Sequence, residues 1–279
     1  MKINCELPNQ MLSMNIDLNE YDFVLLHLFQ SDPIYKEYYK GLRSTHRSRL
    51  MIFDNSAYEF FVKGIELDIE AFKRAILELR PDLFLLPDVL MDRNKTIEKT
   101  QQFLDVWDEN DASTPMAVLQ GNSPEELIGC ANIYKELNIT HIAIPFHNSF
   151  LKEYSQNYNS VYNNHLRNNW RLRLGKIDVD DEYALGRILF IYNYRDVLSQ
   201  FKHVHLLGSH RPFEKFYEQD FDFIKTMDTG YPVKCGIVGY ELGKEPQKPD
   251  VIIDDFLNKD ISIHTQKLIS HNIGIFKQY

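Results

Sequence analysis

Cysteines are few in this sequence and they are not clustered. Cys5, Cys130 and Cys235 are odd in number and far apart along the chain. This spacing excludes the disulfide framework of a small secreted domain, and it offers no group of cysteine ligands for a structural zinc. We therefore expect three buried, reduced thiols and no bound metal.

Long apolar runs are also missing. No stretch approaches the roughly 20 consecutive apolar residues that a membrane span needs. The first five residues, Met-Lys-Ile-Asn-Cys, lack the basic-then-apolar pattern of a secretory signal. The sequence therefore predicts a cytoplasmic protein without a membrane partner.

A positive net charge is the third absence. The formal charge of -9 excludes a protein that coats nucleic acid through its overall field. Two stretches free of acidic residues remain candidates for local phosphate contacts, although such runs more often form a solvated face. They contain Arg43 and Arg47 in the first stretch, and Arg167, Arg171 and Arg173 in the second.

Low-complexity tracts, repeats and Pro/Gly/Ser linkers are absent too, so the sequence predicts one domain over residues 1–279. Short apolar runs of strand length alternate with amphipathic stretches of helical length, which is typical of a parallel sheet. Eight such runs predict a (β/α)8 barrel. The runs are Phe23–Leu28, Leu50–Phe53, Leu83–Leu86, Met116–Leu119, His141–Ile144, Val204–Leu207, Ile224–Met227 and Val251–Ile253.

Helices are indicated between these runs. Apolar residues recur at helical spacing over Ile69–Leu79 and over Thr96–Trp107. The segment Ser-Pro-Glu-Glu at 123–126 is a helix start, with Ser123 as the N-cap and proline at the first helical position.

The interval between the fifth and sixth runs, about 146–203, is too long for one crossover helix and predicts an insertion. Tyr154–Asn169 is rich in Asn and Tyr and indicates a surface loop, whereas Glu182–Phe201 indicates the helix that returns to the next strand. Long irregular segments in compact domains are usually lids or mobile loops. We expect partner contacts there.

Polar residues follow several of the apolar runs directly. Asp54, Asp88, Gln120 and Asp228 each stand where a predicted strand stops. In a barrel these strand ends share one rim, so the four residues are expected to converge on one cavity. A single Asp after a strand more often caps a helix or fixes a turn, but four polar residues at like positions favour an active site.

Facing carboxylates suit chemistry at an acetal-like carbon. In a partly dry cavity their pKa values are pushed apart, so that one is an ionised nucleophile while another holds a proton. A carboxylate can trap the sugar of a glycosidic bond covalently while a second acid serves the leaving group. A glutamine and a carboxylate that accepts paired N–H groups suit the reading of a guanine edge.

Several segments resemble the tRNA-guanine transglycosylases, which are (β/α)8 barrels that exchange guanine in a polynucleotide for a 7-deazaguanine. The segment that begins with Asp54 and carries Tyr58 is similar to the family's Asp-Ser-Gly-Gly-aromatic-Gln. Leu-Pro-Asp88, Val-Leu-Gln120-Gly and Leu-Leu-Gly208-Ser209 resemble its base-pocket segments, and Met-Asp228-Thr-Gly-Tyr-Pro resembles its nucleophile segment.

The resemblance implies a role for each residue. Asp228 would attack the anomeric carbon and Asp54 would be the general acid and base. Asp88 and Gln120 would hydrogen-bond the base, Tyr58 would stack on it, and Gly208 with Ser209 would close the pocket. His210, next along the chain, is a further candidate for a phosphate or base contact, although a lone rim histidine is more often solvated. No redox or nucleotide cofactor is implied.

The departures from the family pattern favour one class of substrate. The tRNA enzymes carry a Cys-x-Cys-x2-Cys…His zinc site after the nucleophile, where only Cys235 stands here, and Ser56 and Ala57 replace the two glycines. A compact, zinc-free chain resembles the phage and bacterial enzymes that place 7-deazaguanines of the preQ0 type into DNA. The expected partners are DNA and a free 7-deazaguanine base.

Three alternatives remain open at this point. The polynucleotide could be tRNA, the chain could be a barrel hydrolase of a small glycoside or nucleoside, or it could be a non-catalytic barrel that binds a partner through 146–203. The sequence does not determine the oligomeric state. His141, His203 and His205, in or beside strand runs, are expected to be structural.

Overall fold

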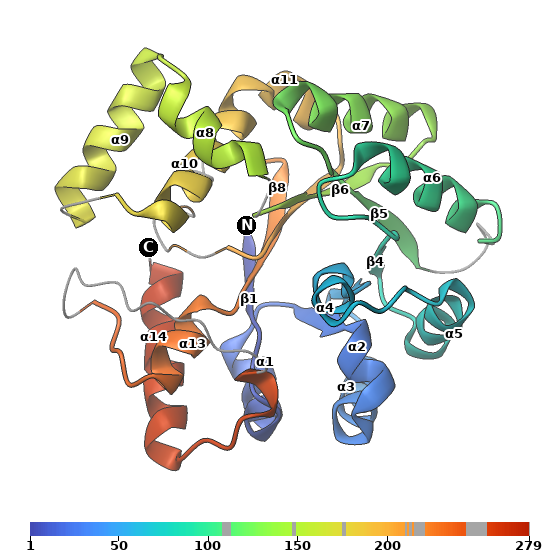
Figure 1. Ribbon diagram of the computed structural model, residues 1–279. Helices are drawn as coiled ribbons and strands as arrows, with labels where there is room; N and C mark the ends of the chain where they lie inside the picture. Colours follow the sequence, from blue (N-terminus) through green and yellow to red (C-terminus); the bar gives the residue numbers. More distant parts are fainter. Residues whose placement is uncertain are drawn as a thin grey trace.

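Eight parallel strands form a nearly closed barrel surrounded by helices, as the sequence predicts (Figure 1). The computed structural model describes residues 1–107, 113–146, 149–174, 177–209, 211, 214, 221–243 and 256–278. Neighbouring strands hydrogen-bond in the order β1-β8-β7-β6-β5-β4-β3-β2. The strands are β1 (Lys2–Cys5), β2 (Asp22–Leu25), β3 (Met51–Asp54), β4 (Leu83–Leu85), β5 (Thr114–Val118), β6 (His141–Pro145), β7 (His203–Leu207) and β8 (Ile224–Thr229).

Helices follow most strands. Those of the first half are α1 (Asn15–Leu18), α2 (Leu26–Ser31), α3 (Pro33–Thr45), α4 (Ala57–Lys63), α5 (Ile69–Leu79), α6 (Arg93–Leu104) and α7 (Pro124–Glu136). Those of the second half are α8 (Ser149–Asn157), α9 (Val161–Leu174), α10 (Val179–Asn193), α11 (Arg195–Leu198), α13 (Tyr231–Ile237) and α14 (Ile263–Gln278). Two 3-10 turns, η1 (Asn9–Met14) and η2 (Phe256–Asn258), complete the described elements.

Two strand predictions need correction. The first strand of the barrel is Lys2–Cys5, which the apolar-run criterion missed because its residues alternate between polar and apolar. The run predicted at 23–28 is a strand only as far as Leu25, since helix α2 begins at Leu26. The run predicted at 251–253 lies outside the described residues.

The barrel is closed between β1 and β2 by side chains rather than by a regular ladder. Asn4 donates from Nδ2 to the carbonyl of Tyr21 (2.8 Å), and the amide of Ile3 donates to the Glu20 carboxylate (2.8 Å). One backbone bond, from Glu20 N–H to the Ile3 carbonyl, joins them (3.2 Å). These bonds satisfy buried backbone groups that a missing ladder would leave unpaired.

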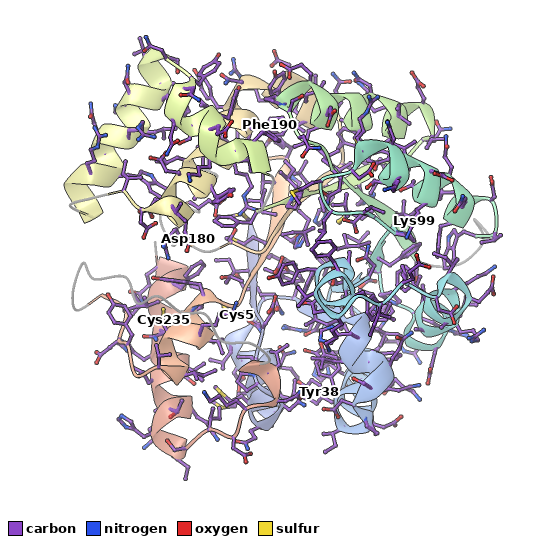
Figure 2. All side chains as sticks on the ribbon, viewed as in Figure 1. Cys5, Tyr38, Lys99, Asp180, Phe190 and Cys235 are labelled. Carbon is purple, nitrogen blue, oxygen red and sulfur yellow. The ribbon has the colours of Figure 1, made fainter. Side chains whose placement is uncertain are left out.

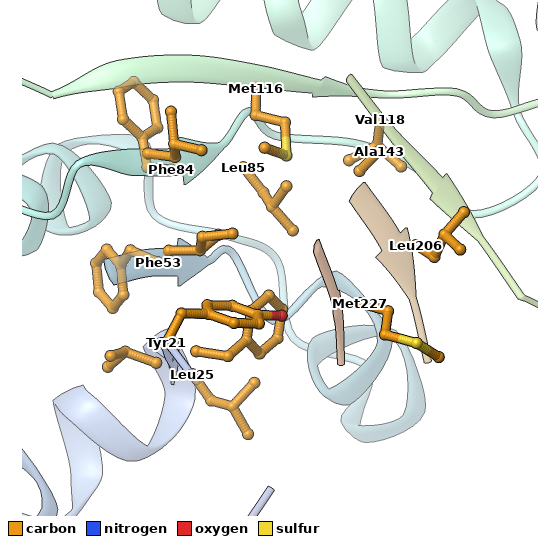
Figure 3. Close-up of a cluster of buried hydrophobic side chains, with 14 of the residues drawn as sticks. Tyr21, Leu25, Phe53, Phe84, Leu85, Met116, Val118, Ala143, Leu206 and Met227 are labelled. Atoms are coloured by element: carbon orange, nitrogen blue, oxygen red, sulfur yellow. The ribbon is translucent and has the colours of Figure 1, made fainter. Parts of the chain in front are cut away.

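Apolar side chains fill the space between the strands and the helices. Figure 3 shows Leu25, Phe53, Leu85 and Met116, from four neighbouring strands, within one buried cluster. Rings from β3, β4 and helices α5 and α6 pack edge-to-face or tilted, with centroid separations of 5.6–6.2 Å. Aromatic pairs favour this arrangement. The core thus fixes the strands that carry the polar residues of the rim.

The helix starts follow local capping rules. Ser123 Oγ accepts the amide of Glu126 (3.2 Å) and proline opens α7, which confirms the predicted start. Helix α5 has the predicted bounds, whereas α6 begins at Arg93, capped by Asp92, and ends at Leu104. Figure 2 labels Cys5 and Cys235, which are buried and free, as is Cys130.

The interval between β6 and β7 is helical and not a loop. Helices α8 and α9 cover most of the stretch at 154–169 for which the composition indicated a surface loop, so that prediction was wrong. Helix α9 is stabilised by burial, since Leu166 and Trp170 pack with Leu185 and Ile188 of α10 in a small second core. Asn-rich sequence disfavours an isolated helix, but tertiary packing overrides that preference. Among the described helices, none is both long and apolar enough to cross a membrane.

Close packing of α10 on α8 gives a prediction for stability. A Cβ added at Gly186 would collide with the backbone carbonyl of Leu151, which cannot move without displacing α8. We expect Gly186→Ala to lower the free energy of unfolding by about 1–3 kcal/mol, measured by urea denaturation. The control is Gly274→Ala on α14, where an added Cβ meets nothing within 4 Å and which should be neutral or slightly stabilising. Equal effects at both positions would contradict this account.

Candidate active site at the carboxyl ends of the strands

The four polar residues that follow predicted strands lie at one end of the barrel. Asp54 ends β3, Asp88 and Gln120 follow β4 and β5, and Asp228 lies near the end of β8. Because all strand pairs are parallel, these positions share the carboxyl end of the sheet. The four residues therefore share one rim, and that they line one cavity stays a prediction.

Asp228 is held by strand β7. Its Oδ1 accepts the backbone amide of Gly208 (3.0 Å) and lies 3.1 Å from Nε2 of His205, and its side chain is almost fully buried. Burial raises the pKa of Asp228 to about 6, while the Gly208 amide and Arg187 favour the ionised form. At neutral pH it is an ionised carboxylate in a largely dry place.

Glu6, directly after β1, is the nearest acidic partner of Asp228, and the sequence interpretation missed it. Each of the two carboxyl groups shifts the pKa of the other. Burial and the charge of Asp228 raise the pKa of Glu6 to about 8. Between these two values one proton is shared by the pair, with Glu6 donating and Asp228 accepting.

A second pair of carboxyl groups stands across the rim. Burial, the charge of Glu59 on α4 and the charge of Asp228 raise the pKa of Asp54 well above its ordinary value. Burial and the charges of Glu6 and Asp228 raise the pKa of Glu59 to about 7. The pKa values of Asp54 and Asp228 are both raised by burial, and those of Asp54 and Glu59 are raised further by neighbouring carboxylates; unequal pKa values of this kind are what an acid and a nucleophile need.

Asp88 is oriented by two amide side chains. Asn55 donates to one of its oxygens and Gln120 to the other, each at 2.7 Å. The remaining oxygen of Gln120 accepts the amide of Met91 (2.9 Å), and Gln120 is buried. Gln120 thus positions Asp88, and its predicted hydrogen bond to the base stays a prediction. Asp88, partly exposed, is the one that can meet a ligand.

The segment after β7 supports Asp228 and the guanidinium of Arg187. Gly208, at a φ of 64°, turns the chain so that its amide reaches Asp228, and it binds the carboxylate directly. Ser209 is fully buried, and its Oγ accepts from the Arg187 guanidinium (2.7 Å). Arg187 also binds the Leu207 carbonyl and Glu214. Predicted residue His210 lies outside the described residues.

Helix α4 carries Tyr58 beside the acidic cluster. Tyr58 is 60% exposed, so its ring is available to a ligand, and α4 is drawn inward of α5 in Figure 1. The helix starts at Ser56, whose φ of 55° is in the left-handed region that favours glycine. Ser56 is held there by His27, which approaches its hydroxyl through both the backbone amide (3.1 Å) and Nδ1 (3.0 Å).

The predicted phosphate-binding arginines do not form one surface. Arg43 makes a bidentate ion pair with Asp82 (2.9 and 3.0 Å), and both Arg43 and the exposed Arg47 lie at the amino ends of the strands, opposite the acidic rim. Arg167 is occupied by Glu182 (2.5 and 2.7 Å) inside the helical interval. Arg171 is exposed on α9, and the side chain of Arg173 lies outside the described part.

No group of three or more His, Cys, Asp or Glu side chains with metal-binding geometry occurs within the described residues. The carboxyl groups of the rim share protons and amide donors instead, as described above. The absence of a zinc ion stays a prediction that elemental analysis of the purified protein can check.

The raised pKa of Glu6 makes a prediction for stability. A carboxyl group with a raised folded pKa supports folding fully below its unfolded value of about 4.5, and this support is lost as pH rises to about 8. Glu6→Gln removes that loss. Because Glu6 is partly exposed and its charge is screened, we expect the variant to gain about 1 kcal/mol over the wild type between pH 5 and pH 9.

Thermal and urea unfolding at both pH values measure this gain. The control is Glu66→Gln, an exposed carboxyl group outside the site, whose difference from wild type should not change between the two pH values. A gain for Glu6→Gln that is larger at pH 5 would contradict the assigned proton sharing.

Comparison with known proteins leaves the resemblance to the guanine transglycosylases as a hypothesis. No protein-family model matches the chain, and no curated protein matches it.

Proposed function

We propose that this barrel is a guanine transglycosylase that exchanges guanine in DNA for a 7-deazaguanine through a covalent sugar ester of Asp228. The observation that supports it best is the placement of Asp54 and an amide-bound Asp228 at one rim, where burial and the neighbouring carboxylates raise the pKa of Asp54 well above its ordinary value. A glycosidic bond needs a nucleophile and an acid of this kind.

Asp228 and Asp54 together account for every bond and proton that changes in the proposed reaction. The Asp228 carboxylate bonds to the anomeric carbon as the bond from that carbon to guanine breaks, and the base leaves with a proton from Asp54. The incoming 7-deazaguanine then loses a proton to Asp54 as its nitrogen attacks the same carbon. The ester bond breaks and restores the Asp228 carboxylate.

Asp88 is the proposed reader of the base. A carboxylate held from both sides by Asn55 and Gln120 can accept the paired N–H groups of a guanine edge. A 7-deazaguanine presents the same edge, so one pocket suits both the leaving and the incoming base. Tyr58, exposed on α4, is placed to stack on a base.

The test of the function is nucleoside mass spectrometry after incubation of the protein with a free 7-deazaguanine and either DNA or tRNA. We expect the modified nucleoside in DNA. Modification of tRNA alone would make the chain a tRNA enzyme, and sugar release from a small nucleoside without a polymer would make it a hydrolase. No reaction with any of the three substrates would contradict the proposal.

Arg171 gives a prediction for binding. Asp178, the N-cap of α10, binds Arg211, which follows Gly208 by three residues on the side of the rim. Helix α9 ends four residues before Asp178. Arg171, in the last turn of α9, therefore lies on the side of the rim. We expect Arg171→Glu to weaken DNA binding and to lower the slope of log affinity against log salt by about 1. Fluorescence anisotropy over a salt series measures both.

The matched control for this variant is Arg47→Glu, at the opposite end of the barrel, which should leave affinity and slope unchanged. If Arg47→Glu weakened DNA binding and Arg171→Glu left it unchanged, the nucleic-acid surface would lie at the amino end of the barrel.

A further inference from the structure

A series of polar side chains runs through the interior of the barrel. Barrel interiors are usually filled by layers of branched apolar residues, but His203 and His205 of β7 bond to Thr226 of β8 here. Nε2 of His203 lies 2.7 Å from the Thr226 hydroxyl, and that hydroxyl lies 2.7 Å from Nδ1 of His205. Nε2 of His205 then reaches Asp228 at 3.1 Å.

The two ends of this series face different sides of the molecule. Asp228 belongs to the rim at the carboxyl ends of the strands. His203 lines a cavity of about 520 Å³ at the amino ends, together with Leu50, Phe221 and Thr226. The hydrogen-bonded series therefore connects that cavity with the candidate active site through the middle of the barrel.

The hydrogen positions follow from the charge of Asp228. Burial lowers the pKa of both His203 and His205 to about 3, so both rings are neutral and each carries one proton. An ionised Asp228 only accepts, which places the His205 proton on Nε2. His205 Nδ1 then accepts from the Thr226 hydroxyl, which in turn accepts from His203 Nε2, and His203 Nδ1 is left bare.

Protonation of Asp228 exchanges the donor and the acceptor in every hydrogen bond of the series. The Asp228 hydroxyl then donates to His205 Nε2, and the His205 proton must sit on Nδ1. Thr226 accepts that proton and donates to His203, whose own proton moves to Nδ1. The two arrangements differ by one proton, which is present at Asp228 in the second and absent in the first.

We propose that His203, Thr226 and His205 form a proton path between the cavity at the amino end and Asp228. Water in the cavity protonates His203 Nδ1, His203 Nε2 passes its proton to Thr226, Thr226 passes its own to His205 Nδ1, and His205 Nε2 protonates Asp228. The reverse sequence ionises Asp228 again. The path lets Asp228 exchange protons while a ligand covers the rim, whichever bond that carboxylate attacks.

Other charged groups act on both ends of the series, and Arg187 also acts on His205 in its middle. Glu6, Arg187 and Asp54 act on Asp228 at the rim, and His141 and Lys225 act on His203 at the cavity. The middle of the series is enclosed by rings, with Phe23 stacked on His205 at 5.2 Å and Tyr21 against its edge at 6.4 Å. The Thr226 hydroxyl thus connects the two histidine rings, and through them the two ends of the series.

Long-range ¹H–¹⁵N NMR of histidine-labelled protein tests the path, because it distinguishes a protonated ring nitrogen from a bare one. His203→Gln and His205→Gln variants assign the two rings. We expect both rings to carry their proton on Nε2 at pH 8 and both to switch to Nδ1 together at pH 5. Asp228→Asn should abolish the switch. A His205 with one tautomer throughout, or a His203 that does not follow it, overturns the proposal.

Substitution of Thr226 tests the connection itself. Thr226→Val keeps the shape and removes the hydroxyl, so His205 should still switch with Asp228 while His203 no longer follows. Thr226→Ser, which keeps the hydroxyl, should preserve the joint switch. A folded Thr226→Val protein in which both rings still switch together overturns the proposal, and if that variant does not fold, the wild-type titration decides. None of these spectra depends on base exchange, so failure of the path and failure of the proposed reaction are separate results.

Discussion

Asp228→Asn is expected to abolish both base exchange and the covalent adduct between protein and DNA. The substitution keeps the shape of the side chain, so an amide oxygen can still accept from Gly208, but the charge that attacks the sugar is gone. We expect a loss of at least about 10⁴-fold in exchange rate. The adduct of the wild type is measured on a denaturing gel after incubation with DNA and no replacement base, when the ester cannot be resolved by an incoming base.

The control for this variant is Asp196→Asn, the same chemical change at a fully exposed side chain of α11, which should leave adduct and exchange intact. An adduct that forms normally with Asp228→Asn would remove Asp228 from the role of nucleophile. Equal loss in both variants would indicate a defect unrelated to the rim.

Asp54→Asn is expected to slow adduct formation by about 10²- to 10⁴-fold without abolishing it, as is typical of the loss of a general acid. The leaving guanine then lacks its proposed proton donor, a carboxyl group whose pKa is raised by burial and by the charge of Glu59. The amide of Ser56, which donates to Asp54 (2.7 Å), can bond the asparagine oxygen instead, so the turn is kept. Single-turnover measurement of the adduct gives the rate.

Glu59→Gln is the informative comparison for Asp54. Removal of a negative neighbour lowers the pKa of Asp54, so the alkaline limb of the rate profile should move to lower pH while the rate at pH 6 changes little. If the adduct instead vanished with Asp54→Asn and persisted with Asp228→Asn, the roles of acid and nucleophile would be exchanged.

The fold could be predicted from the sequence because most of its strands are buried on both faces. Such strands are continuous apolar runs, and seven of the eight predicted runs coincide at least in part with strands. Strand β1 escaped because Asn4 within it and Glu6 directly after it are polar. The alternation of Ile3, Cys5 and Leu7 with polar residues was the available signal, since a period of two is typical of a strand.

The site was predictable in position more than in role. A polar residue at a strand end fixes which rim it joins, so Asp54, Asp88 and Asp228 could be placed together. The sequence does not specify which polar group faces the cavity and which supports another. Gln120 and Ser209 are buried supports, while His205, expected to be only structural, contacts Asp228. The pairing of Glu6 with Asp228 depends on β1 lying next to β8 in the closed barrel, and the sequence does not show which strands become neighbours.

Barrel closure also has a consequence for the order of folding. Strand β1 forms its ladder with β8, with Asn4 opposite Asp228, so β1 must wait for a strand that is synthesised more than 200 residues later. The intervening strands pair with near neighbours in the chain and can assemble during synthesis, whereas this contact is the most distant one in the sheet. Glu6 and Asp228 are therefore expected to meet late, and a nascent chain that has formed most of its core would still lack this carboxyl pair.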